Sequence, residues 1–205
     1  MSDDEAARKL FAGPCDFIWG AADAAGLPPA RLPEIAFVGR SNAGKSSLIN
    51  ALTARKTLAR VSHTPGRTRQ INFFDLGGRL VLADLPGYGY AKASRSLAEE
   101  WQSLIFAYLR GRAALKRVIL LIDARRGAMD TDKQAMALLD RAAVSYVLAL
   151  TKIDQLSAAE RALAEHALAE EAQRHTAAYP QTFATSGLKR IGLDALKAHI
   201  AALAA

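Results

Sequence analysis

The chain has 205 residues, 51% hydrophobic and 23% charged, as expected of a globular protein with one well-packed domain. The single cysteine excludes an intrachain disulfide, and the four histidines are too scattered for structural zinc. The acidic start argues against a signal peptide, and the apolar runs are too short to span a membrane. We therefore expect a cytoplasmic protein. The net charge of +7 favours a polyanionic partner, such as nucleic acid or an anionic membrane face, although many basic proteins bind neither.

The predicted elements alternate between strands and helices after an N-terminal segment rich in Ala, Gly and Pro. We expect residues 1–31 to form an arm and residues 32–205 to form one domain. Strands are predicted at residues 34–39, 71–77, 79–84, 117–123, 145–151 and 181–186. Helices are predicted at residues 45–54, 95–112, 131–142, 157–175 and 191–203.

This order predicts an α/β fold. Nearly continuous apolar strands separated by helices indicate a mostly parallel sheet with helices on both faces. Gly77 and Gly78 indicate a hairpin, so we expect six strands, one of them antiparallel. Ligands of such sheets bind beyond the carboxyl ends of the strands.

The sequence GRSNAGKS, residues 39–46, lies between a predicted strand and a predicted helix. It has the form G-x-x-x-x-G-K-[ST], in which the glycines let successive N–H groups face a phosphate at the positive end of a helix. In such a loop Lys45 neutralises the β- and γ-phosphates and the Ser46 hydroxyl binds Mg²⁺. A glycine-rich turn with an incidental lysine would not explain the context. The loop therefore predicts a nucleoside triphosphate site.

The sequence DLPGYGY begins at Asp84, the end of a predicted strand. At the end of such a strand, the Asp84 carboxylate would hold Mg²⁺ through water and the Gly87 N–H would meet the γ-phosphate. The alternative is that the D-x-x-G sequence forms an ordinary turn. Many switch proteins place a water-positioning Gln after this Gly, but here the residue is Tyr88, which has no amide. We therefore expect slow intrinsic hydrolysis, ~10⁻⁴ to 10⁻³ s⁻¹ as in unassisted switches.

The sequence ALTKID, residues 149–154, has the form [NT]-K-x-D after a predicted strand. Asp154 can accept hydrogen bonds from N1–H and N2–H₂ of guanine, whereas adenine offers neither donor, so discrimination can reach ~10⁴. The Lys152 stem can cover the purine face. The alternative is a strand end whose Asp caps the next helix. Further on, in TSGLK, we expect the N–H of Ser186 to donate to guanine O6.

The polar, basic loop from about residue 54 to residue 69 carries Thr68. Such a loop can become ordered only when γ-phosphate and Mg²⁺ are present, as in other nucleotide switches. An ordinary long surface loop would have the same composition.

The ordered set GRSNAGKS, TPGRTRQINFF, DLPGYGYAK, LTKID and TSGLKRIG resembles the EngB-type GTPases, in the group that also holds Era, EngA and TrmE. The resemblance runs from about Leu32 to the C-terminus. It implies a P-loop NTPase G domain that acts as a monomeric GTP switch for assembly of the large ribosomal subunit, with a family link to cell division and septation. It places the second Mg²⁺ ligand on Thr68. The sequence TSG replaces the usual FSS near Ser186.

The resemblance and the motifs together give the expected site. The metal ligands would be Ser46, Thr68 and Asp84. The residues expected to bind GTP or GDP are Gly39, Arg40, Ser41, Asn42, Ala43, Gly44, Lys45, Ser46, Ser47, Gly66, Arg67, Thr68, Arg69, Gln70, Asp84, Leu85, Pro86, Gly87, Thr151, Lys152, Ile153, Asp154, Thr185, Ser186 and Gly187.

Catalysis is expected to involve Lys45, Thr68 and Asn42. Related GTPases with an apolar residue after the D-x-x-G glycine often use K⁺ held partly by a P-loop Asn, and Asn42 occupies the matching place. The alternative is that Asn42 only shapes the loop.

The partner that we expect is the large ribosomal subunit, through rRNA or ribosomal proteins. The basic residues near the switches are Arg60, His63, Arg67, Arg69, Lys92 and Arg95, with Arg125 and Arg126 further off. Tyr88, Tyr90 and Lys92 are expected to form a mobile aromatic and basic face that reports the nucleotide state. The alternatives are a nucleotide-dependent scaffold at the division site and an ATP-dependent small-molecule kinase; Asp154 argues against the kinase.

Overall fold

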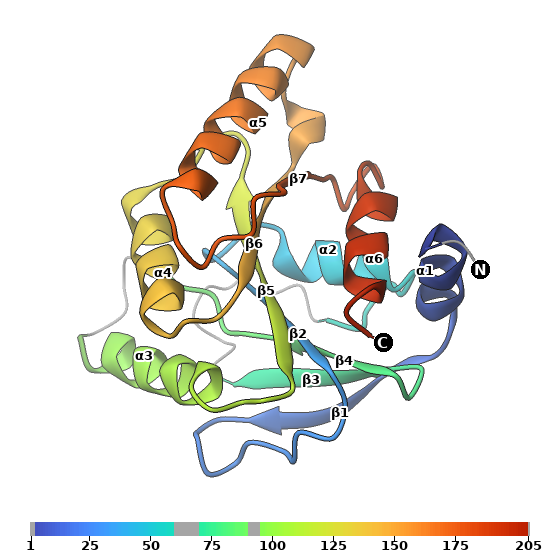
Figure 1. Ribbon diagram of the computed structural model, residues 1–205, viewed down its shortest axis with the longest axis vertical. Coiled ribbons are helices and arrows are strands. Elements are labelled where there is room, and N and C mark those ends of the chain that lie inside the picture. The colour runs from blue at the N-terminus through green and yellow to red at the C-terminus, as the bar shows by residue number, and fades with distance from the viewer. Residues whose placement is uncertain (1–2, 60–69, 90–94, 205) are drawn as a thin grey trace.

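The computed structural model describes residues 3–59, 70–89 and 95–204, with backbone alone for residues 3 and 95–101. In these residues seven strands form one sheet in the order β1-β3-β4-β2-β5-β6-β7 (Figure 1). The strands are β1 (Cys15–Ala21), β2 (Glu34–Gly39), β3 (Ile71–Leu76), β4 (Leu80–Asp84), β5 (Leu115–Asp123), β6 (Tyr146–Thr151) and β7 (Phe183–Ala184).

The sheet confirms the predicted α/β class and its single antiparallel strand. Strand β3 pairs antiparallel with both β1 and β4, while the pairs β4·β2, β2·β5, β5·β6 and β6·β7 are parallel. In the three-residue turn between β3 and β4, Gly77 and Gly78 have φ of 64° and 66°, a left-handed conformation that glycine adopts without steric cost. The predicted hairpin is thus confirmed.

Helices cover both faces of the sheet (Figure 1). Helices α3 (Arg95–Leu109), α4 (Asp130–Arg141) and α5 (Ala158–Gln173) lie on one face, and α1 (Asp3–Ala12), α2 (Lys45–Leu52) and α6 (Leu193–Ala201) lie on the other. A short 3₁₀ helix, η1 (Ile153–Gln155), follows β6. Among the described residues, no helix combines the length and apolarity needed to cross a bilayer.

Each face of the sheet has its own hydrophobic core, because neighbouring residues of a strand point to opposite faces. Val38 and Leu120 belong to the core under α3, α4 and α5, whereas Phe37 and Ile119 belong to the core under α1, α2 and α6. All four side chains are buried. Burial on both faces explains why the central strands are almost continuously apolar in sequence.

The prediction of six strands is wrong, because the N-terminal segment adds a seventh strand to the sheet. Residues 3–21, expected within an arm, form helix α1, which packs against α6, and strand β1, which pairs with β3 at the edge of the sheet. Strand β1 leaves Phe17, Ile18 and Trp19 about half exposed, and its pairing with β3 is interrupted between Phe17 and Trp19. An edge strand exposed in this way lacks the alternating pattern by which strands are predicted.

Candidate nucleotide-binding site

The loop of residues 40–44 leaves the carboxyl end of β2 and leads directly into α2, as the GRSNAGKS motif predicts. Asn42 and Gly44 have φ of 66° and 90°, which the glycine adopts without steric cost. A Cβ on Gly39 would lie 3.0 Å from the Leu121 carbonyl oxygen, so this position also favours glycine. The backbone therefore has the curled form that presents N–H groups to an anion at a helix N-terminus.

Thr151 and Lys152, predicted to bind guanine, are hydrogen-bonded to this loop. The Thr151 hydroxyl donates to the Ala43 carbonyl at 2.6 Å, and the Lys152 ammonium donates to the Asn42 carbonyl at 2.6 Å. Two loop carbonyls are thereby drawn toward β6. Since N–H and C=O of one trans peptide point in opposite directions, the N–H of Gly44 is turned the other way. The structure thus joins the phosphate motif to the guanine motif.

Lys45 and Asp84 form an ion pair between the start of α2 and the end of β4. Both side chains are largely buried. The lysine and the carboxylate expected to meet a phosphate and a metal ion thus lie in direct contact. An incoming phosphate would compete with Asp84 for the ammonium.

The D-x-x-G segment is bonded to the P-loop through its backbone. The N–H of Ser41 donates to the Tyr88 carbonyl at 2.9 Å, and the N–H of Tyr88 donates to the Gly39 carbonyl at 3.3 Å. A Cβ on Gly87 would lie 3.2 Å from both Ser41 N and the Gly39 carbonyl, so the two segments pack closely. The Ser41 N–H is therefore occupied in this conformation.

The Tyr88 side chain corrects the prediction of a mobile aromatic face. It is 8% exposed, and its hydroxyl donates to Asp132 Oδ1 of α4 at 2.8 Å. Burial, and then the neighbouring Asp132, raise the Tyr88 pKa well above its ordinary value. The second Asp132 oxygen accepts from the Met129 N–H at 2.9 Å, so the same carboxylate both caps α4 and holds the Tyr88 hydroxyl. Tyr90 and Lys92 lie outside the described residues.

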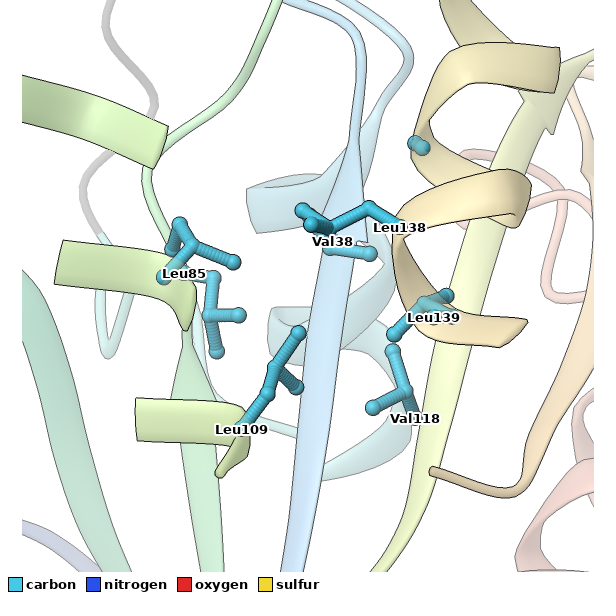
Figure 2. Close-up of a pocket in the computed structure, with 8 residues that line it drawn as sticks. Val38, Leu85, Leu109, Val118, Leu138 and Leu139 are labelled. Carbon is cyan, nitrogen blue, oxygen red and sulfur yellow. The ribbon is translucent and has the colours of Figure 1, made fainter. Parts of the chain in front are cut away.

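Leu85 contributes to the core and not to a polar site. Its side chain lines a small apolar pocket between α3, α4 and the sheet, together with Val38, Leu109 and Leu139 (Figure 2). Its N–H donates to the Phe37 carbonyl at 3.0 Å, which continues the pairing of β4 with β2. This pocket is separate from the polar loops at the carboxyl ends of the strands.

The TSG segment lies against the start of α2. A Cβ on Gly187 would be 2.9 Å from the Ser47 carbonyl oxygen, so this residue closely approaches the helix. The N–H of Ser186, however, donates to the Ile191 carbonyl at 3.0 Å, and the Ser186 side chain is buried. The expectation that this N–H meets guanine O6 is therefore not supported. Thr185 is also committed, since its hydroxyl donates to the Leu150 carbonyl at 2.7 Å.

Several predicted site residues lie apart from this cluster or outside the described residues. Gly66, Arg67, Thr68 and Arg69 fall in the undescribed range 60–69. The Gln70 amide donates to Asn72 at 2.9 Å and would meet a Cβ on Gly20, so it lies on the β1 side of the sheet. Asp154 and Ile153 lie in η1 directly after Lys152; Ile153 is buried and Asp154 is partly exposed.

The residues at hand suit a magnesium ion. Ser46 is partly exposed in the first turn of α2, and the buried Asp84 carboxylate lies beside the neighbouring Lys45. A hydroxyl and a carboxylate are hard oxygen ligands of the kind that Mg²⁺ prefers. Among the described residues no cluster of three His, Cys, Asp or Glu side chains could hold a metal ion.

Two residues were missed by the sequence analysis. Asp123, the last residue of β5, accepts hydrogen bonds from Lys152 and Arg125. Asp132 anchors Tyr88. The signal for Asp123 was available, because a carboxylate ending an apolar strand between the P-loop strand and the guanine strand must lie at the ligand edge of the sheet.

The fold and this arrangement of loops define a P-loop GTPase domain. A family model described as 50S ribosome-binding GTPase matches residues 34–152. The probable GTP-binding protein EngB of Gluconobacter oxydans is 54% identical over 202 residues, covering 98% of this chain and 88% of the relative. That of Rhodospirillum rubrum is 51% identical over 205 residues, covering 98% and 89%. The chain belongs to the family of EngB GTP-binding proteins.

Solved structures agree at the level of the fold. The crystal structure of a probable GTP-binding protein engB has a TM-score of 0.67 and 23% identity, covering 83% of this chain and 98% of that one. A structure of Era in complex with MgGDPNP and nucleotides of 16S ribosomal RNA also has a TM-score of 0.67, at 23% identity, covering 84% and 56%.

Proposed function

We propose that this member of the GTPase family is a switch that binds GTP and GDP with Mg²⁺ and hydrolyses GTP slowly. The observation that carries the proposal is the pair of hydrogen bonds from Thr151 and Lys152 to the P-loop carbonyls of Ala43 and Asn42. They bring the P-loop and the TKID segment together at the edge of the sheet formed by the carboxyl ends of the strands, which supports one nucleotide bound across both motifs.

Each motif has a distinct part in the proposed complex. The P-loop N–H groups and Lys45 bind the phosphates, while Asp154 accepts from N1–H and N2–H₂ of guanine. Ser46, Asp84 and Thr68 would hold Mg²⁺, which when bound neutralises charge on the β- and γ-phosphates. Lys45 then exchanges Asp84 for phosphate oxygens, so that the ammonium keeps an anionic partner with and without nucleotide.

Slow hydrolysis is supported by the position of Tyr88. Its hydroxyl is bound to Asp132 and its ring is buried, so it has neither the amide nor the freedom to orient an attacking water. We expect an intrinsic rate of ~10⁻⁴ to 10⁻³ s⁻¹.

We also propose that K⁺ supplies positive charge beside the phosphates through Asn42, whose side chain is exposed at the loop. An arginine finger in this role increases the rate by ~10³ or more. Turnover should be faster in K⁺ than in Na⁺ for the wild type and equal in both for Asn42→Ala. Equal rates for the wild type would exclude the potassium role.

The proposed partner is the large ribosomal subunit in the cytoplasm, where the protein acts as a monomer during subunit assembly. The support is the description of the matching family model and the net charge of +7. Arg125 and Arg126, next to the nucleotide edge of the sheet, are exposed and suit contact with phosphates. The alternative within the family is a division-site scaffold that binds protein.

The first test is nucleotide specificity, measured by equilibrium binding of fluorescent GDP with competing ADP. GDP but not ADP should compete, and competition by ADP would exclude the guanine assignment.

The second test is co-sedimentation with ribosomal subunits, with the protein loaded with a non-hydrolysable GTP analogue or with GDP. The GTP form should pellet with large subunits, and added salt should weaken the binding. Absence of binding in both states would favour the scaffold.

A further inference from the structure

Asp123 lies between the two motifs of the site without belonging to either. It is the last residue of β5, the strand between β2, which carries the P-loop, and β6, which carries the guanine motif. In the parallel register, Asp123 is level with Thr151, the first residue of that motif. Its carboxylate therefore lies at the edge of the sheet where the nucleotide is proposed to bind.

The carboxylate is held by two cations. It accepts from the Lys152 ammonium at 2.9 Å, and from Nε and Nη2 of Arg125 at 2.9 and 2.6 Å. Burial alone would raise the Asp123 pKa, but the hydrogen bonds from Arg125 and Lys152 hold it well below its ordinary value. The group is thus a permanent anion at physiological pH.

Lys152 is the residue whose position depends on this anion. Its ammonium has two anchors, the Asp123 carboxylate and the Asn42 carbonyl. Its stem crosses the P-loop, since its Cε lies 3.6 Å from where a Cβ on Gly44 would be. Its backbone has φ of 59°, a conformation uncommon for a non-glycine residue. Several contacts therefore hold the side chain in one place.

We infer that Asp123 is a positioning residue for the guanine nucleotide, which fixes the Lys152 side chain across the P-loop. The inference rests on the proposed function. Arg125 has a lesser part, because its side chain is 42% exposed and its guanidinium bonds Asp123. Loss of the Asp123 charge leaves the Lys152 ammonium with the Asn42 carbonyl as its remaining anchor. The Lys152 stem, which is proposed to cover the purine face, and the P-loop at Asn42 are then both held less firmly.

A purely structural role for Asp123 makes different predictions. Its Oδ1 also accepts from the backbone N–H of Arg125 at 3.1 Å, which stabilises the turn after β5. Asp123→Asn retains an acceptor oxygen for that N–H and removes the charge that holds Lys152. Arg125→Gln is the matched control, since it removes the other cation and leaves the contact with Lys152.

The experiment measures the dissociation rate of a fluorescent GDP analogue and the thermal midpoint. Asp123→Asn should increase GDP dissociation about tenfold, as expected for loss of a charge-assisted hydrogen bond, with little change in the thermal midpoint. Arg125→Gln should have a clearly smaller effect. In a Lys152→Met background, Asp123→Asn should add nothing further.

The inference is overturned if Asp123→Asn changes GDP dissociation by less than about threefold, if Arg125→Gln has an equal effect, or if the effect persists in the Lys152→Met background. Failure of the wild type to bind GDP would instead refute the proposed function itself. The two failures are therefore distinguishable in one set of measurements.

Discussion

Single residues at the ligand edge of the sheet divide into those that contact the nucleotide and those that hold others in place. Asp154, two residues after Lys152, belongs to the first kind in the proposed complex, and Asp132 to the second, since it anchors Tyr88. The two kinds have different experimental signatures. Loss of a contact residue changes ligand preference, whereas loss of Asp132, which holds a buried ring in place, changes stability.

Asp154→Asn should change the preferred base. An Asn side chain offers a donor where the carboxylate offered an acceptor, so it suits the C2 carbonyl of xanthine and leaves the guanine N2–H₂ unpaired. Affinity for GDP should fall by about 10²-fold or more and affinity for XDP should rise, as competition binding would measure. Unchanged GDP affinity would remove Asp154 from the site.

Tyr88→Phe should destabilise the fold by about 1–3 kcal/mol, because it removes the buried hydrogen bond to Asp132. Urea unfolding measures the change, with Tyr179→Phe as a control on a ring that is 40% exposed. The intrinsic rate of GTP hydrolysis should stay the same. A large loss of hydrolysis would mean that the hydroxyl acts on water.

At the scale of elements, a buried ion pair ties the start of β2 to the chain that follows α3. Arg112 donates to both oxygens of Glu34, at 2.6 and 2.7 Å, and Tyr108 of α3 donates to the same carboxylate at 2.9 Å. Arg112 also donates to the Pro28 carbonyl at 3.0 Å. One carboxylate thus organises three segments at the end of the sheet opposite the nucleotide edge.

Arg112→Leu should cost about 3–5 kcal/mol, because Glu34 is left buried without a cation. The double variant Glu34→Leu with Arg112→Leu should be much more stable than the sum of the single changes predicts, since it removes both charges. Denaturant unfolding of the four proteins tests this. Additive losses would show that packing, and not the pair of charges, dominates.

The sequence predicted the elements of the central sheet well because their signals are local. Buried parallel strands such as β5 are almost continuously apolar, and the P-loop motif itself indicates a turn followed by the start of a helix. Strand β1 was missed because its partner, β3, is distant in sequence and its side chains at Phe17–Trp19 are exposed.

The Ser186 geometry was missed for a related reason. The bridge between Ser186 and Ile191 depends on Gly192, which has φ of 68° and where a Cβ would lie 2.0 Å from the Ala184 carbonyl. Only a three-dimensional turn shows that the Ser186 N–H is occupied. Pairings between distant segments, such as Tyr88 with Asp132, are not encoded in any local pattern.

At the scale of the whole molecule, stability should depend on pH through His199 of α6. Burial, and then the nearby Arg117, lower the His199 pKa from its ordinary 6.5 to about 4. Below pH 6.5 His199 binds a proton in the unfolded chain but not in the folded protein. The free energy of unfolding is therefore highest above that pH and falls as the pH drops toward 4. The pH dependence is confined to the range between these two pKa values.

His199→Phe should flatten this dependence between pH 6.5 and pH 4, because the aromatic neighbours Tyr179 and Phe183 accept a Phe ring. Unfolding in urea across that pH range measures it. His166→Gln, on the exposed side of α5, serves as the control and should keep the wild-type slope. An unchanged slope in His199→Phe would assign the dependence to other groups.

The packing of α1 against α6 has a consequence for how the chain is made. Among the described helices, α1 leaves the ribosome first and α6 is synthesised last, so the first helix has no docking surface until translation of the domain is nearly complete. The edge strand β1 must likewise wait for β3. Closure over such sequence separations is slow compared with helix formation. Among the described helices, α1 is therefore the one that a nascent chain exposes longest, and the one on which a chaperone has most time to act.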